Sequence, residues 1–205
     1  AGGVTSIMDM PNTNPLTVTL DALNAKLDLL NEKCIVNHSC YFGATNNNYT
    51  EFDKLDKHRV CGIKLFMGSS TGNMLVDKMN SLLNIFNGTD MLIAAHCEDQ
   101  ETIKNNIEKY KQKYKGADDI PVSAHPSIRS VPACYASSEL AVRLAKIAGA
   151  RLHILHVSTA KELQLFSDEP LTNKNITAEA CVAHLLFTLT HYNSLGARIK
   201  CNPAV

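Results

Sequence analysis

Three short apolar runs in this sequence carry a lysine or a histidine near their C-terminal ends. The runs span residues 60–68 with Lys64, 91–99 with His96, and 151–158 with His156. A polar or charged side chain in such a run is costly to bury unless it has a partner. In an α/β barrel, catalytic residues gather at the C-terminal ends of the strands. One lysine and two histidines at that place would suit a divalent metal site.

The alternation of side chains along a strand supports this interpretation. Alternate residues of a strand lie on one face. The three sets that share a face are Gly62, Lys64 and Phe66; Leu92, Ala94 and His96; and Leu152, Ile154 and His156. In each set the polar side chain accompanies small or apolar residues, which is the composition that a barrel lumen requires.

Strand-like and helix-like segments alternate along the whole chain. Either Thr17 or Thr19 is expected to cap the first helix. Ser137 or Ser138 is expected to cap a later helix that Gly149 ends. We also expect a loop over 117–134, a helix over 159–166, an apolar helix near 182–192, and an extended segment over 198–205.

About six strand–helix units are predicted, which places the chain in the α/β class. A closed (β/α)₈ barrel needs eight units and about 250 residues, so an open doubly wound sheet fits the 205 residues better. The placement of the polar residues favours a TIM-type barrel. We expect one domain over residues 1–205.

The composition is that of an ordinary globular protein. Lysine and arginine number 20 against 20 aspartates and glutamates, so there is no basic surplus for nucleic acid or an anionic membrane. No apolar run reaches the roughly 18 residues that a membrane helix needs. The seven cysteines form no CxxC pair. Together with an N-terminus unlike a signal peptide, they predict reduced thiols and a cytoplasmic protein.

Six segments also carry a resemblance to a known family. They are MPNTNP (10–15), GIKLFM (62–67), HCED (96–99), HVS (156–158), ITAEACVAHL (176–185) and KCNP (200–203). In this order they resemble motifs of the dihydroorotases, which belong to the amidohydrolase superfamily of metal-dependent (β/α)₈ barrels. The matched segments correspond to strands two through seven of that barrel, so the resemblance implies an incomplete barrel.

The resemblance implies a site for two divalent ions, zinc in this interpretation. Lys64 would be carboxylated and bridge the ions, because an unmodified ammonium cannot ligate a cation. His96 and His156 would each supply one nitrogen ligand. Asn12 would contact the substrate carboxylate. Asn202 would either contact the substrate or serve only as a loop residue.

The sequence departs from the family pattern in three places. The HxH pair of the first strand and the catalytic aspartate of the eighth strand have no counterpart, and Ala183 replaces the first histidine of the HHL motif. We therefore expect the general-base aspartate beyond the C-terminus. We also expect the sequence to be the middle of a longer protein or a partial gene product.

Three functions remain open at this point. The first is a dihydroorotase, which hydrolyses dihydroorotate reversibly to N-carbamoyl-aspartate in pyrimidine biosynthesis. The second is an allantoinase or hydantoinase, and the third is a non-catalytic homologue of the same fold. The MPNT, TAEA and KCNP segments favour the first function. Retention of Lys64, His96 and His156 argues against the third.

Several properties are not determined by the sequence. The expected partner is a small-molecule substrate, with neither nucleic acid nor membrane, and a homodimer is one alternative for the oligomeric state. The identity of the metal is open. So are the roles of His125, Arg129 and His184.

Overall fold

The computed structural model describes residues 2–68, 74–116, 118 and 120–205. Its chain forms two compact units. The first unit comprises Ala1–His96 and Leu144–His153, and the second comprises Cys97–Arg143 and Ile154–Val205. Helix α5 (Val131–Ala148) and strand β5 (Leu152–Ile154) contribute residues to both units.

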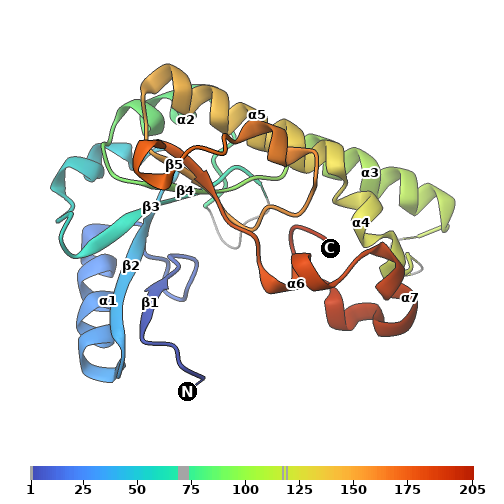
Figure 1. Ribbon diagram of the computed structural model, residues 1–205, viewed down its shortest axis with the longest axis horizontal. Coiled ribbons are helices and arrows are strands. Elements are labelled where there is room, and N and C mark those ends of the chain that lie inside the picture. The colour runs from blue at the N-terminus through green and yellow to red at the C-terminus, as the bar shows by residue number, and fades with distance from the viewer. Residues whose placement is uncertain (1, 69–73, 117, 119) are drawn as a thin grey trace. The chain divides into compact units, whose positions relative to one another are not determined.

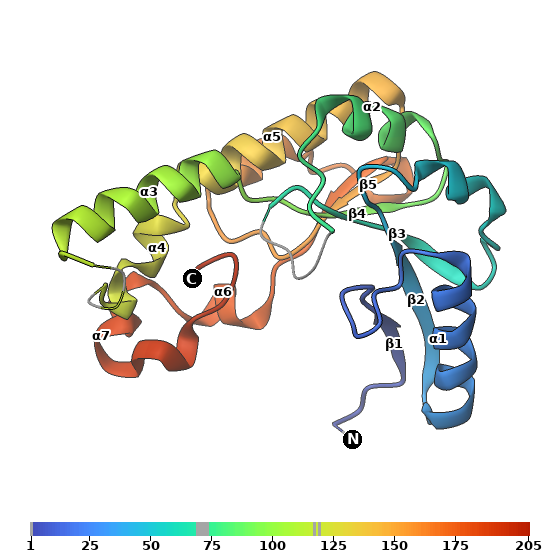
Figure 2. The same cartoon turned by 180° about the vertical axis from the view of Figure 1, so that it is seen from behind.

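The first unit is built on parallel strands joined by helices (Figure 1). Its further elements are β1 (Ser6–Asp9), α1 (Leu20–Lys33), β2 (Asn37–Gly43), β3 (Val60–Phe66), α2 (Met79–Asn87) and β4 (Ile93–His96). Thr19 caps α1 as expected, because its hydroxyl accepts a hydrogen bond from the Ala22 amide at 3.2 Å. Helix α1 lies alongside β2 in both Figure 1 and Figure 2.

The six strands follow one another in the sheet in the order β1-β2-β3-β4-β5-β6. The β3–β4 register pairs Lys64 with Ala94 and Phe66 with His96. Strand β3 is buried along nearly its whole length, as is typical of a parallel sheet covered on both faces. Gly62 permits a close approach here, since a Cβ atom at that position would lie 2.5 Å from the Leu92 carbonyl oxygen.

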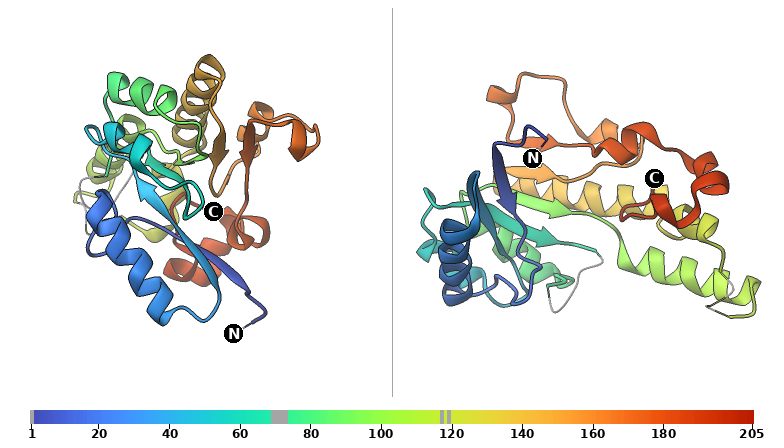
Figure 3. Two further views of the ribbon diagram at one scale, coloured as in Figure 1. Left: turned by 90° about the vertical axis from the view of Figure 1, so that its left-hand side faces the viewer. Right: turned by 90° about the horizontal axis from the view of Figure 1, so that it is seen from below.

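The second unit contains the remaining elements. These are α3 (Gln100–Lys113), α4 (His125–Ile128), β6 (Ile176–Ala178), α6 (Val182–Leu186) and α7 (Tyr192–Leu195). Figure 3 gives two further views of α3 and of the short α4 beside it. Strand β6 lies next to β5 in the sheet. Glu179, directly after β6, donates its amide hydrogen to the carbonyl of Ile154 in β5 at 3.1 Å.

Several expectations for this part of the chain are wrong. Helix α5 begins at Val131, so Ser137 and Ser138 are buried in its interior and cap nothing. The expected loop over 117–134 accordingly contains α4 and the first turn of α5 in its described part. Gly149 does end α5, with a φ of 67° that suits glycine.

The expected helix over 182–192 is also interrupted. The Thr188 amide is hydrogen-bonded to His191 Nδ1 at 3.0 Å, and this capping box starts a new turn there. The segment over 159–166 forms only a 3₁₀ turn, Glu162–Leu165, and the segment over 198–205 begins within another, Gly196–Ile199. Among the described residues, no helix is long and apolar enough to cross a membrane.

Candidate functional site

Lys64 is buried in strand β3 of the first unit, with 2% of its surface exposed. Its Nζ donates a hydrogen bond to the Leu65 carbonyl at 3.1 Å. The same atom lies 3.6 Å from the centre of the Phe66 ring, in a cation–π contact. Burying an amine of this kind is costly, and Lys64 is therefore not an edge residue with its amine in water.

His96 occupies the end of the neighbouring strand β4 and is 5% exposed. Its ring centroid lies 5.9 Å from that of Phe66. Because Phe66 pairs with His96 and lies two residues beyond Lys64, all three side chains share one face of the β3–β4 pair. The shared face expected for Lys64 and His96 is therefore confirmed, while their role as ligands remains a prediction.

His156 belongs to the second unit and lies outside the strand. Strand β5 ends at Ile154, and His156 has a φ of 41°, in the left-handed region. The alternation of side chains along β5, which was expected to place His156 on the same face as Ile154, thus ends two residues before His156. Its neighbour Val157 is anchored by an amide hydrogen bond to the Glu179 carbonyl, 2.7 Å long.

The two predicted substrate-binding asparagines both lie in loops with exposed side chains. Asn12 follows β1, in a turn closed by a hydrogen bond from the Thr17 amide to the Pro11 carbonyl at 2.9 Å. Asn202 lies in the second unit, near the C-terminus of the chain. Exposure leaves both side chains accessible to a ligand.

The donor set fits a metal ion only in part. Among the residues that the structure describes, no three His, Cys, Asp or Glu side chains gather closely enough to hold an ion. A neutral imidazole such as that of His96 is an ordinary zinc ligand. An ion beside it would need oxygen donors from Lys64, which a lysine carbamate would provide and a lysine amine does not. The face of β3 and β4 therefore fits a metal only if Lys64 is carboxylated.

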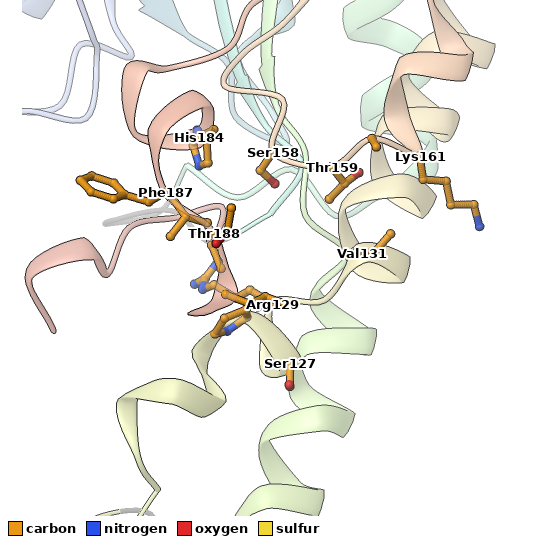
Figure 4. Close-up of a pocket in the computed structure, with 14 residues that line it drawn as sticks. Ser127, Arg129, Val131, Ser158, Thr159, Lys161, His184, Phe187 and Thr188 are labelled. Carbon is orange, nitrogen blue, oxygen red and sulfur yellow. The ribbon is translucent and has the colours of Figure 1, made fainter. Parts of the chain in front are cut away.

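The second unit contains a pocket of about 520 Å³. Hydroxyl groups of Ser158 and Thr159, the Arg129 guanidinium and the His184 imidazole line it, together with apolar side chains including Phe187 (Figure 4). This size is within the range of small-molecule sites. The mixture of apolar surface and a few polar groups suits a small polar ligand.

A buried ion pair supports one wall of this pocket. Arg129 Nη1 donates to Glu98 Oε2, and the Glu98 side chain has no exposed surface while that of Arg129 is 12% exposed. Sequence analysis left the role of Arg129 open. The two partners lie 31 positions apart in the sequence, so no local pattern indicated their pairing.

Comparison with known proteins identifies the relatives of this chain. No protein-family model matches it. A dihydroorotase from Methanosphaera stadtmanae is 30% identical over 209 residues, which cover 98% of this chain and 45% of that protein. An allantoinase from Deinococcus radiodurans is 27% identical over 212 residues, covering 99% and 46%.

The chain is a homologue of the cyclic amidohydrolases. These enzymes belong to the amidohydrolase superfamily, so the resemblance seen in the motifs is confirmed at that level. The chain spans about half the length of the curated relatives that it matches.

Solved structures of hydantoinases share the fold. An L-hydantoinase from Arthrobacter aurescens superposes with a TM-score of 0.89 at 26% identity, covering 100% of this chain and 45% of that one. A D-hydantoinase gives a TM-score of 0.83 at 20% identity, which shows the fold alone. These neighbours are TIM barrels. The six-stranded parallel sheet is therefore part of a barrel, as the sequence predicted.

Proposed function

We propose that this chain is part of a dihydroorotase, which hydrolyses the cyclic amide of dihydroorotate reversibly to N-carbamoyl-aspartate in de novo pyrimidine biosynthesis. The observation that carries the proposal is the buried Lys64 on the same face as His96. The dihydroorotase among its relatives and the order of the six motifs favour this substrate.

Lys64 and His96 have distinct parts in the proposed reaction. Two zinc ions, when bound, would lower the pKa of water and polarise the ring carbonyl. Lys64, as a carbamate, would supply oxygen ligands, and His96 and His156 would each supply one neutral nitrogen. Hydrolysis adds the oxygen of water to the carbonyl carbon and breaks the ring C–N bond, and the leaving nitrogen takes a proton. The family resemblance implies that an aspartate with no counterpart in these 205 residues would move this proton.

Asn12 is the proposed determinant of substrate choice. Its exposed side chain can donate a hydrogen bond to the carboxylate that dihydroorotate carries and an unsubstituted cyclic imide lacks. The partners proposed with this function are a small-molecule substrate and a second copy of the protein in a homodimer, and the proposed location is the cytoplasm.

A second candidate function is hydrolysis of allantoin or a hydantoin. The allantoinase relative and the L-hydantoinase structure favour it, because their similarity to the chain is close to that of the dihydroorotase. The two functions differ in the ring that is opened and share the proposed metal chemistry.

The test compares dihydroorotate, allantoin and hydantoin as substrates of the protein at its full encoded length. Lys64→Met should abolish nearly all turnover and lower the metal content, while Lys33→Met at an exposed site should preserve both. Asn12→Ala should weaken turnover of dihydroorotate about ten- to a hundredfold, since a hydrogen bond to a charged group contributes about 1.5–3 kcal/mol.

The same substitution should leave an uncharged cyclic imide nearly unaffected. Equal losses on both substrates would contradict the role of Asn12. Preferred turnover of allantoin or hydantoin by the unmodified protein would favour the second function, and near-normal turnover by Lys64→Met would refute the metal-bridging role.

A further inference from the structure

Two imidazoles hold the backbone on either side of Asn202. His125 Nε2 lies 2.8 Å from the Cys201 carbonyl oxygen, and His184 Nε2 lies 3.1 Å from the Pro203 carbonyl oxygen. A carbonyl oxygen only accepts hydrogen bonds, so each ring must donate from Nε2. Two donors from separate elements thus converge on the two carbonyls that flank one residue.

The first of these contacts lies in a poorly solvated place. His125 is the first residue of α4 and is 9% exposed. Burial lowers the pKa of its imidazole, which favours a neutral ring with its hydrogen on Nε2. Because water has little access there, loss of this hydrogen bond would leave the Cys201 carbonyl poorly satisfied.

The second contact ties the same segment to the pocket. His184 lies in α6 and lines the pocket of about 520 Å³, as do Ala204 and Val205, which follow the held carbonyls. The thiol of Cys201 donates to the Pro203 carbonyl at 3.3 Å and adds a local restraint. The backbone over 201–203 is therefore fixed from two sides, and the Asn202 side chain remains exposed.

We propose that His125 and His184 are positioning residues that form a two-histidine clamp and hold Asn202 in the orientation that binds substrate. The inference deepens the proposed function and rests on it for the identity of the substrate. A side chain on a fixed backbone loses less conformational freedom on binding than one on a mobile backbone. The clamp therefore acts through Asn202 and touches no reacting atom.

The clamp is tested first without any activity, on the protein at its full encoded length. Hydrogen–deuterium exchange of the amides over 201–205 is measured for His125→Leu and His184→Leu, which remove the donors. Each should speed exchange of the Asn202, Ala204 and Val205 amides two- to tenfold, because the segment opens locally more often when one of its carbonyls loses its donor. His125→Gln and His184→Gln, whose side-chain amides can replace the Nε2 donor, should restore most of the protection. His58→Leu, at an exposed histidine, is the matched control.

Kinetics of the full-length protein then test the effect on Asn202. Either leucine variant should raise KM for dihydroorotate about tenfold, with kcat within twofold and metal content unchanged, and should add little to the defect of Asn202→Ala. Unchanged exchange in both leucine variants, or glutamine variants that behave like leucine, would refute the clamp. An unchanged KM despite faster exchange would refute its positioning role. Absence of dihydroorotate turnover in the unmodified protein would instead refute the proposed function, while the exchange data would still decide whether the clamp exists.

Discussion

The buried pair of Glu98 and Arg129 offers the sharpest test of the packing in the second unit. Arg129→Met keeps an unbranched apolar side chain and removes the guanidinium. It leaves a carboxylate that has no exposed surface and has lost its ion pair with the guanidinium. Breaking a buried pair in this way destabilises a protein by about 3–5 kcal/mol.

The magnitude follows from the difference in exposure between this pair and a surface pair. Lys111 and Glu108 form an ion pair of 2.8 Å on α3, with side chains 39% and 54% exposed. Exposed pairs contribute about 0–1 kcal/mol, so Lys111→Met is a matched control. For a chain of this length each kcal/mol corresponds to about 2–4 °C in Tm. Arg129→Met should therefore lower Tm by about 6–20 °C and Lys111→Met by less than about 4 °C.

A double-mutant cycle separates the pair from its surroundings. The free energy of unfolding is measured by urea denaturation for Glu98→Met, Arg129→Met and the double variant. The double variant should recover most of the loss, because replacing both charges with apolar side chains of similar size is often neutral. Equal effects of Arg129→Met and Lys111→Met, or strictly additive losses in the cycle, would refute the buried pair.

Three further predictions concern thiols, pH and one glycine. Burial raises the pKa of Cys134 to about 12, so iodoacetamide at pH 8 should label exposed Cys181 in the native protein and Cys134 only after denaturation, as mass spectrometry would show. Burial lowers the pKa of His125 below its usual value of about 6.5. The unfolded chain therefore binds a proton at this histidine more readily than the native protein, so the native state loses stability as the pH falls below about 6.5. His125→Gln should flatten the dependence of urea midpoints on pH. Gly62→Ala should reduce the free energy of unfolding by about 1–3 kcal/mol, because the added methyl group would lie 2.5 Å from a backbone oxygen; an unchanged midpoint would contradict the close approach.

The sheet of the first unit could be predicted because its signals are local. Alternation along β3 placed Lys64 and Phe66 on one face, and the parallel register brought His96 to the same face. The N-cap at Thr19 and the end of α5 at Gly149 could likewise be predicted, since each depends on the chemistry of a single residue at a helix end.

The failures had two causes, a local signal stronger than the one followed and tertiary contacts that the sequence pattern does not contain. Pro132, in the first turn of α5, is a helix-start signal that outweighs the later serines. Ser138 donates instead to the buried Glu162 carboxylate at 2.6 Å. At His156 the alternation stops with the strand, so its direction could not be derived from the pattern.

The contacts of the second-unit pocket were beyond the reach of sequence patterns. The two contacts of the histidine clamp join residues that are 76 and 19 positions apart. In both, the accepting atom is a backbone carbonyl oxygen. Backbone carbonyls carry no residue signature, so nothing in the pattern indicates which of them a histidine will contact.

The strand order of the sheet has a consequence for synthesis of the protein. Each strand pairs with the one that precedes it in the chain, so no strand must wait for a distant segment before it finds its neighbour. Pairings between nearby segments lower the entropy cost of loop closure. The sheet can therefore grow strand by strand as the polypeptide leaves the ribosome, with β1 and β2 paired while β6 is still untranslated. Translation, at about 5–20 residues per second, would then set the pace of assembly.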